Sequence, residues 1–430
     1  MKPSDTAPPV HVEPSTREPR MWHVLVIALV VSLFAVVWLV VYDEISTLIW
    51  EDAFLAVNRW AIPVGVLFFS LLVGLVERYL HAPNMIHGGA EESLHAGDVT
   101  TYRVFWGTLL SSFLSLWSGA SIGPEAPLGI LAVQISEWIA SKLRLAKQGT
   151  ILVALAGMAA AYNGIVGSPV FATLAVSEGN AGKGGLALIR SNLAAGATGF
   201  LVFSLLGVPA FAGFLDVGQV TELSVAHVAY AILLGLVGAV VAVYMGLVTR
   251  GAGRLFSVFD EQPIRRIMIG AAIIAVVCYF IPELMFSGEK QIRAIMDHAA
   301  QVGVAMLLVM ALLKPLLLAI SLKSGYLGGP IFPALFSAVM VGLAVNLLLP
   351  GIPLAIVIPC LEVAVVTLLL RAPLTSIMLV AVVTLVTSTM LGLITVSAVT
   401  SMIAGIVLRE LLERRGSRTD GPETPVPAGG

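Results

Sequence analysis

Charged residues are scarce in this chain. Only 12% of its 430 residues are Asp, Glu, Lys or Arg, whereas soluble domains carry about 25%. This scarcity excludes an ordinary soluble protein, and a hydrophobic content of 58% with a mean hydropathy of +0.96 indicates an integral membrane protein. The formal net charge is only −2, which gives no electrostatic basis for binding nucleic acid.

Cysteine is also scarce. Cys278 and Cys360 are the only two, and both lie in apolar segments. A disulfide framework or a cysteine metal cluster is therefore not expected, and no metal or organic cofactor is predicted. The histidines lie mainly at segment edges and in the tails, so the sequence specifies no buried Ser–His pair for an intramembrane hydrolase.

Polar segments stand at both ends of the chain. The first apolar run, 22–42, is long enough to span a bilayer and lacks a convincing cleavage site, so no cleavable signal is expected. Basic residues flank the apolar region, and the positive-inside tendency places both termini in the cytoplasm of a cell-membrane protein. They are Lys2, Arg17, Arg20, Arg409, Arg414, Arg415 and Arg418. The predicted divisions are a disordered tail at 1–20, a transmembrane domain at 21–413 with halves at 21–208 and 223–413, and a disordered tail at 414–430.

Apolar segments recur almost end to end, and several are shorter than the ~20 residues of a full span. Many are interrupted by Gly or Pro, which a membrane tolerates only where protein or a water-filled cavity covers the freed backbone. This pattern is typical of transporters and channels that bind ions near the bilayer midplane. The segments are 22–42, 61–80, 103–117, 125–142, 149–162, 169–178, 184–208, 223–249, 265–282, 303–322, 331–349, 352–370, 374–390 and 392–408.

The interruptions recur at corresponding places in the two halves. Tyr162-Asn-Gly-Ile-Val-Gly-Ser-Pro169 precedes an apolar helix, as Leu370-Arg-Ala-Pro-Leu-Thr-Ser376 does later. The run 118–129 has a similar counterpart at 324–333. Paired interruptions indicate inverted repeats with a site between them. We therefore predict an all-α membrane bundle of inverted repeats, in which several helices are short or re-entrant.

Glu125 is the most informative residue, in Ser118-Gly-Ala-Ser-Ile-Gly-Pro-Glu-Ala-Pro-Leu-Gly129. A carboxylate within apolar sequence is costly unless it is paired or wetted, and it usually marks an ion path. Pro124 and Pro127 suit the first turn of a helix. Glu125 is therefore predicted beside the unpaired N–H groups of a helix start, where an anion is held best. In a soluble protein the same carboxylate would be read as a simple stabiliser of the helix dipole; here we predict that it plugs an anion site.

Four motifs resemble, in order, those of the CLC family of chloride channels and proton-coupled chloride antiporters. Gly123-Pro-Glu-Ala-Pro127 resembles G-x-E-G-P, whose Glu gates the anion path. Ser324-Gly-Tyr-Leu-Gly-Gly-Pro-Ile-Phe-Pro333 resembles S-G-x-x-G-G-x-F-x-P, a helix start at the central anion site. Ala156-Gly-Met-Ala-Ala-Ala-Tyr-Asn163 resembles G-x-A-A-A-F-N, and Leu370-Arg-Ala-Pro-Leu-Thr-Ser-Ile-Met-Leu-Val380 resembles L-R-A-P-L-T-G-I-I-L-V. Lys314 is similar to a Lys that the family places before the second of these motifs.

The resemblance implies a CLC-like fold and anion transport without enzyme activity. It suggests a divergent prokaryotic-type member that lacks regulatory domains and forms a homodimer with one pore in each subunit. Glu125 would gate a path whose anion-binding walls include Gly123, Gly329 and Ile331. Ionised, its carboxylate competes with the permeant anion, chloride or another inorganic anion; protonated, it loses that attraction and swings aside.

Three ligands of the family are missing or altered. The family's G-S-G-I-P-E falls on His87-Gly-Gly-Ala-Glu-Glu92, so Gly88 replaces the ion-coordinating Ser. No Tyr follows Tyr326, and Pro330 removes a backbone N–H near the central anion. Selectivity for chloride therefore does not carry over. Replacement hydroxyls are available, although hydroxyls in membrane helices more often bond their own backbone. They belong to Thr384, Thr387, Ser388 and Thr389.

Proton coupling depends on a second carboxylate. The family's antiporters carry it late in the helix after N-A-P, which here corresponds to Gly179, next to Glu178. Glu178 is either the proton relay or an interfacial carboxylate. Because the proton Glu is not cleanly present, we favour a voltage-gated-type chloride channel. The alternatives are a proton-coupled chloride antiporter and a secondary transporter of another anion on the same scaffold. Arg371 either lines a vestibule that attracts anions or anchors the cytoplasmic edge.

An intramembrane metalloenzyme is the remote alternative. His87, Glu91 and His95 are spaced at i, i+4 and i+8, which aligns three metal ligands on a helix. Gly88 and Gly89 weaken that helix, and no further strong ligand is apparent. We therefore predict no metal site there.

Overall fold

Helices form the described part of this chain. The computed structural model describes residues 18–54, 58–86, 100–179, 185–208 and 213–419, and within these an isolated antiparallel bridge joins Gly123 and Gly329. Nine of the described helical stretches are long and apolar enough to cross a membrane. The predicted all-α membrane fold is thereby confirmed.

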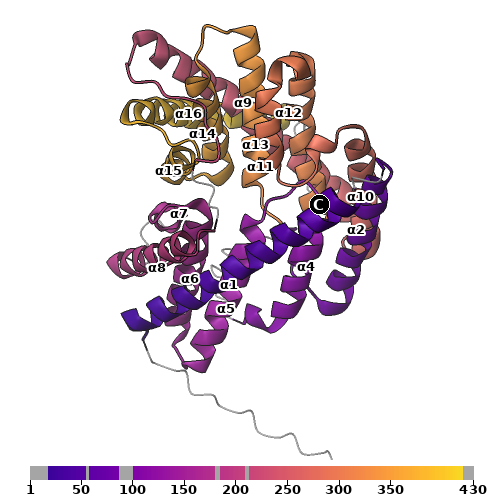
Figure 1. Cartoon of the computed structure of the whole chain (residues 1–430), viewed down its shortest axis with the longest axis vertical. Helices are drawn as coiled ribbons and strands as arrows, with labels where there is room; N and C mark the ends of the chain where they lie inside the picture. The colour runs from indigo at the N-terminus through magenta and orange to yellow at the C-terminus, as the bar shows by residue number, and fades with distance from the viewer. Residues whose placement is uncertain (1–17, 55–57, 87–99, 180–184, 209–212, 420–430) are drawn as a thin grey trace, which may run out of the picture.

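The described helices fall into two groups along the chain, one in each of the two predicted halves. In Figure 1 the first half lies in the lower part of the view and most of the second half in the upper part. The first half contains α1 (Met21–Thr47), α2 (Ala61–Leu80), α4 (Phe105–Trp117), α5 (Glu125–Lys142), α6 (Lys147–Val166), α7 (Phe171–Gly179) and α8 (Gly185–Leu205). The second contains α9 (Val225–Phe256), α10 (Pro263–Phe280), α11 (Glu289–Asp297), α12 (Ala299–Ser324), α13 (Ile331–Leu348), α14 (Leu354–Leu370), α15 (Pro373–Val383) and α16 (Ser388–Thr419). Four short helices are η1 (Leu48–Phe54), η2 (Thr101–Val104), η3 (Ser257–Phe259) and η4 (Pro282–Leu284).

The C-terminal helix is longer than the sequence analysis expected. α16 ends at Thr419, whereas we placed the start of a disordered tail at residue 414. Leu, Glu and Arg predominate in this stretch, and they are among the strongest helix formers, so the helix continues although the apolar run has ended. Residues 1–17 and 420–430 of the two predicted tails lie outside the described residues.

Small residues allow helices of the second half to pack closely. A Cβ on Gly235 of α9 would stand 2.8 Å from the carbonyl oxygen of Ser397 and 2.9 Å from Cβ of Thr400, both on α16. A Cβ on Gly405 of α16 would stand 2.6 Å from Cδ2 of Leu368 on α14. In lipid, such close contact is a main source of attraction between helices. It holds α9, α14 and α16 together.

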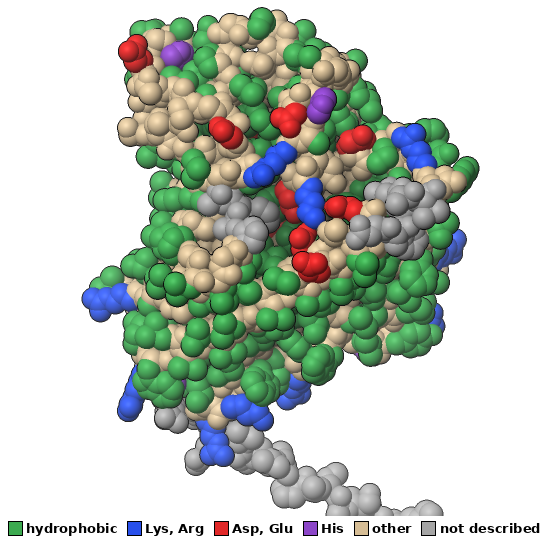
Figure 2. Space-filling model, in the orientation of Figure 1, with side chains coloured by type: hydrophobic (Ala, Val, Ile, Leu, Met, Phe, Trp, Pro, Cys, Tyr) green, Lys and Arg blue, Asp and Glu red, His purple; other side chains and the backbone are tan. Residues whose placement is uncertain are grey.

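The visible outer surface is mostly hydrophobic, which suits contact with lipid (Figure 2). Acidic and basic side chains gather around a hollow near the middle of this face, and further basic ones lie at its lower margin. Apolar side chains on the outside of the long helices include Leu29 at 45% exposed, Val240 at 61% and Ile403 at 58%. Such residues are costly in water and favourable in a bilayer.

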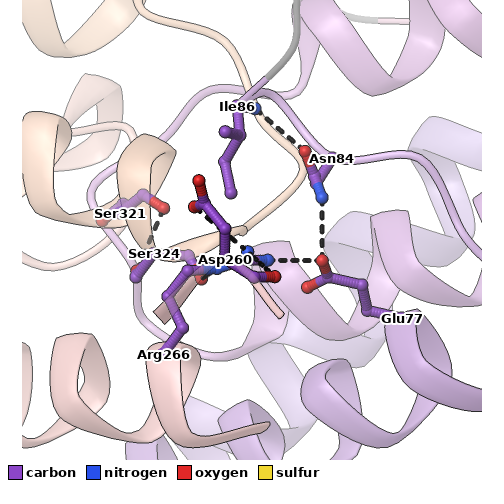
Figure 3. A network of polar contacts seen from close by, with 7 residues as sticks. All are labelled: Glu77, Asn84, Ile86, Asp260, Arg266, Ser321 and Ser324. Carbon is purple, nitrogen blue, oxygen red and sulfur yellow. Dashed lines mark hydrogen bonds and ion pairs between the residues drawn. The ribbon is translucent and has the colours of Figure 1, made fainter. Parts of the chain in front are cut away.

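A buried network around Arg266 fixes the end of α12 (Figure 3). Arg266, on α10, is 2% exposed and forms an ion pair with Glu77 of α2. Its Nε donates to the Ser324 carbonyl oxygen at 3.0 Å, and Nη1 donates to the Asp260 carbonyl oxygen at 3.2 Å. Asn84 Nδ2 also donates to Glu77 Oε1, at 2.8 Å. The network therefore ties α2 and α10 to the residue at which α12 ends.

We predict that Arg266→Ala destabilises the protein by about 3–5 kcal/mol, because it leaves the buried Glu77 carboxylate without its cation. The neighbouring Arg265→Ala should change stability little, since the Arg265 side chain is exposed on the same helix. Thermal unfolding of the two purified variants in detergent measures the difference. Equal unfolding temperatures for both variants and the unmodified protein would show that the network does not hold α12.

Candidate anion gate

Two helices of equal length begin after the same pair of residues. α5 follows Gly123-Pro124 and α13 follows Gly329-Pro330, and each helix has 18 residues. Pro124 and Pro330 are the N-cap residues, with φ of −76° and −95°. Proline is tolerated at a helix start because an N–H there has no partner within the helix. Both starts thus present backbone N–H groups from the residues that follow each proline.

The two helix starts are joined directly by their glycines. Gly123 N–H donates to the Gly329 carbonyl oxygen at 2.8 Å, and Gly329 N–H donates to the Gly123 carbonyl oxygen at 2.8 Å. This is the isolated bridge of the fold, and it links the two halves at one point. Both of the predicted anion-binding glycines therefore use their N–H groups on each other in this state.

Glu125 occupies the N-terminus of the opposite helix. Its side chain is 6% exposed, and Oε1 accepts the backbone N–H of Ile331 at 2.7 Å. Oε2 is buried and has no hydrogen-bond partner among the described residues. The positive end of the α13 dipole favours an anion at this position. The structure thus brings together Glu125, Gly123, Gly329 and Ile331, all four of the residues that the sequence analysis placed at the site.

The carboxyl group fits because both flanking residues are glycine. A Cβ on Gly123 would stand 2.8 Å from Glu125 Cδ and 2.9 Å from Oε1. A Cβ on Gly329 would meet Cδ and Oε1 of Glu125 even more closely, with Cγ at 2.6 Å. Contacts this short do not occur for real Cβ atoms, so any side chain at either position displaces the carboxyl group.

Each loop that carries a helix start is held by a serine of the other half. Ser115 Oγ, on α4, accepts the N–H of Leu327 at 3.1 Å. Ser321 Oγ, on α12, accepts the N–H of Ser121 at 3.3 Å. Gly325 follows the last residue of α12 and begins the loop that leads to α13. Its φ is +113°, a value that a residue with a side chain rarely adopts. The positions of the two starts are therefore set by contacts between the halves.

Lys314 holds a backbone segment that lies next to the site. It is fully buried, and its Nζ donates to the carbonyl oxygens of residues 284–286 at 3.0, 3.2 and 2.6 Å. Nζ also lies 4.8 Å from the centre of the Phe336 ring, on α13. The backbone N–H of Phe286 in turn donates to the Gly119 carbonyl oxygen at 3.3 Å. Lys314 thus fixes a segment that contacts the loop before α5.

A cavity of about 300 Å³ lies between α9, α12, α14 and α16 and extends to the residue before α13. Its lining includes Pro330, next to the gate, and two arginines, Arg250 and Arg371. Neither arginine forms an ion pair with a described carboxylate. Arg371 ends α14 in the left-handed region, with φ of 55°. Two roles were left open for Arg371, lining a vestibule or anchoring the cytoplasmic edge. Its position in the lining of this cavity agrees with the vestibule role.

Glu178 is near the end of α7, and its carboxylate lies at the start of α15. Its Oε1 accepts the N–H of Leu374 at 2.8 Å, and its Oε2 accepts the N–H and the hydroxyl of Thr375 at 2.8 and 2.6 Å. These donors belong to the first turn of α15, so Glu178 satisfies N–H groups that lack helical partners. None of these hydrogen bonds reaches the Glu125 site.

Three of the four hydroxyls that were considered as substitute ligands donate to backbone carbonyl oxygens. Thr384 Oγ1 donates to the Val380 carbonyl oxygen at 2.7 Å. Thr387 and Thr389 donate to carbonyl oxygens of residues 220 and 221, each at 3.2 Å. Only Thr384 bonds its own helix in the way that is usual for hydroxyls in membrane helices, whereas the other two join α16 and the residue before it to the segment that precedes α9.

The motif predictions for residues 87–92 and for His95 lie outside the described residues, and with them Gly88 and Glu91. Within the described ranges, no group of three or more His, Cys, Asp or Glu side chains is placed to hold a metal ion.

Glu362 is a buried carboxyl group that the sequence analysis missed. It lies in the middle of α14, is 0% exposed, and has no hydrogen-bond partner for Oε1 or Oε2 among the described residues. A sequence signal was available, because it is the one charged residue in Leu354–Leu370. A charge inside an apolar segment marks a candidate site even without a motif.

Comparisons with known proteins place this chain in a family. The family model described as "Voltage gated chloride channel" matches residues 88–405. "Putative ion-transport protein YfeO" of Escherichia fergusonii is 25% identical over 342 residues, which cover 76% of this chain and 78% of that protein. The YfeO protein of Salmonella newport is 27% identical over 305 residues, covering 68% of this chain and 71% of that protein.

Solved structures share the fold. A slow cyanobacterial Cl−/H+ antiporter matches with a TM-score of 0.77 at 16% identity, covering 94% of this chain and 100% of that one. A CLC-type fluoride/proton antiporter matches with a TM-score of 0.73 at 17% identity, covering 89% of this chain and 94% of that one. Together with four sequence motifs and two paired helix starts, the family match shows that the chain belongs to the voltage-gated chloride channel, or CLC, family.

Proposed function

We propose that this protein moves small inorganic anions across a membrane and that Glu125 is the gate of the path. The observation that carries the proposal is the hydrogen bond from the Ile331 N–H to the buried Glu125 carboxyl group. A helix start in a membrane is an anion site, and here the protein's own carboxylate fills it. Chloride is the anion to test first, as both the family and the sequence motifs suggest.

The gate works through competition between two anions. While Glu125 is ionised, its carboxylate holds the N-terminus of α13 and excludes a free anion from that position. A proton on the carboxyl group removes its negative charge and most of its attraction to the helix start. The side chain is then free to leave, and an anion takes its place. Anion flux should therefore rise as pH falls.

The cavity lined by Arg250 and Arg371, which we call the vestibule, supplies the anions. Arg250 and Arg371 line a cavity that reaches Pro330, the residue before the gate-binding helix. Cations around a low-dielectric cleft raise the local concentration of anions. The proposed path thus runs from this vestibule to the position now filled by the Glu125 carboxyl group.

Passive conduction and proton-coupled exchange are both candidates for the mode of transport. The sequence favours a channel, because the proton Glu of the family's antiporters is replaced by Gly179, with Glu178 beside it. Glu178 as a proton relay is a further proposal, although three donors of α15 hold its carboxylate. Exchange would follow from the proposed gate itself, because the carboxyl group that blocks the path is also the group that takes up the proton. We further propose a homodimer in the cell membrane with both termini in the cytoplasm.

Glu125→Gln should conduct anions at neutral pH and lose most of the pH dependence of transport, because a neutral amide mimics the protonated acid. Anion efflux from liposomes containing purified protein, measured between about pH 5 and about pH 7.5, tests this expectation. Glu261→Gln is the control, since Glu261 is exposed and far along the chain from the gate. A pH dependence like that of the unmodified protein in Glu125→Gln would count against the gate. No flux of chloride, fluoride or nitrate in any variant would sink the proposed function.

Gly329→Ala should reduce anion flux by at least about tenfold, which corresponds to about 1.4 kcal/mol. Its Cβ would occupy the space of the carboxyl group and of any anion that replaces it. Gly351→Ala is the matched control in another loop, because a Cβ there meets nothing within 4 Å. The same efflux assay applies, with size-exclusion profiles to confirm folding. Unchanged flux in folded Gly329→Ala would mean that anions do not bind where the carboxyl group lies.

A further inference from the structure

We propose that Glu362 is a second proton-carrying side chain of the transport cycle, which exchanges protons with Glu125 and couples proton movement to anion movement. The proposal rests on the anion transport proposed above, and it assigns to Glu362 the coupling role that the family's missing proton carboxylate leaves open.

Glu362 differs from the other buried carboxyl groups in having nothing to bind. Glu77 is paired with Arg266, Glu125 accepts the Ile331 N–H, and Glu137 Oε2 accepts the Thr101 hydroxyl at 2.6 Å. Both oxygens of Glu362 are buried without a hydrogen-bond partner in the described structure. A carboxyl group with a purely structural role would be expected to find a partner, because an unpartnered one destabilises the fold.

The surroundings of Glu362 hold no fixed countercharge near it. α14 packs against α9, α13, α15 and α16. α13 and α15 contain no acidic or basic residue, and the charges of α9 and α16 lie towards the ends of those helices. An ionised carboxylate in such a place is unstable, so Glu362 rests as the neutral acid and holds a proton. The ionisable groups on the packed elements are Cys360 on α14; His227, Tyr230, Tyr244, Arg250 and Arg254 on α9; and, on α16, those from Arg409 onward.

Helix geometry places Glu362 along the contact between α13 and α14. Ile358 lies one turn before it on the same face, and Ile358 Cγ1 stands 3.2 Å from the position of a Cβ on Gly342 of α13. Leu369 lies two turns after it on nearly the same face and lines the vestibule together with Pro330. At a rise of 1.5 Å per residue, Glu362 is about 10 Å along the axis from Leu369 and roughly 12 Å from the level of Ile331.

The two carboxyl groups share no hydrogen bond, so the proposed proton transfer needs a chain of water molecules between them. The O–H bond of Glu362 breaks, its proton passes to water between the helices, and an O–H bond forms on the Glu125 carboxylate. The Glu362 carboxylate then takes a proton from the aqueous side and returns to its neutral state. One proton is moved for each cycle of the pair, and no electrons are transferred. The unpartnered Oε2 of Glu125 offers the accepting atom.

The test measures chloride efflux and proton uptake together in one liposome suspension, for the unmodified protein and for Glu362→Gln. We expect chloride efflux to persist in the variant, while the ratio of protons to chloride falls by at least about tenfold. Glu261→Gln is the control, since Glu261 is exposed and has no role in the proposed path, and its ratio should stay within about twofold of the unmodified value. Glu178→Gln tests the alternative relay. Glu362→Met is the second variant. It should unfold at a temperature no lower than the unmodified protein, because it removes an unpartnered polar group, and it should be uncoupled in the same way.

Three results would overturn this inference and leave the anion gate standing. The first is chloride efflux without proton uptake in the unmodified protein. The second is an unchanged proton-to-chloride ratio in both Glu362 variants. The third is loss of coupling in Glu178→Gln alone. Absence of any anion flux in the unmodified protein would instead contradict the proposed function itself, so the two failures are distinguishable.

Discussion

The reciprocal hydrogen bonds between Gly123 and Gly329 are the constraint on which the rest of the site depends. They bring the first turns of α5 and α13 together, although the two glycines lie in different halves of the chain. Only at this separation does the Ile331 N–H reach the Glu125 carboxyl group. Both positions also require glycine, because a Cβ at either one would overlap the Glu125 carboxyl group. This single pair of glycines thus sets both the contact between the two helix starts and the space for the carboxyl group.

Two buried cations stabilise this arrangement without entering the path. Arg266 binds the last carbonyl of α12 and Lys314 binds three carbonyls of residues 284–286, so each fixes a segment that leads to the gate. Buried charges are retained where hydrogen bonds compensate for lost hydration, and both residues have such partners. The cations that face a cavity are different ones, Arg250 and Arg371. Structural and anion-attracting roles are therefore divided among the basic residues.

Much of the architecture was predictable, because hydrophobic runs and Gly/Pro interruptions act locally. The run 125–142 coincides with α5 and 61–80 with α2, and Glu125 was identified from its apolar surroundings alone. The pairing of Gly123 with Gly329 was not predictable in atomic detail. Local patterns do not specify which backbone groups of distant segments meet. The extension of α16 to Thr419 was missed because hydropathy falls before helix propensity does.

Glu178 and Glu362 show why residue type and position alone do not identify a proton carrier. Motif spacing pointed to Gly179, next to Glu178, yet the Glu178 carboxylate accepts three hydrogen bonds at the start of α15, which give the residue a structural use. No motif favoured Glu362, and it has no partner at all in the described structure. A carboxyl group exchanges its proton most readily when no fixed hydrogen-bond partner holds it in one protonation state. The environment therefore assigns the proton to Glu362, and only a structure reveals that environment.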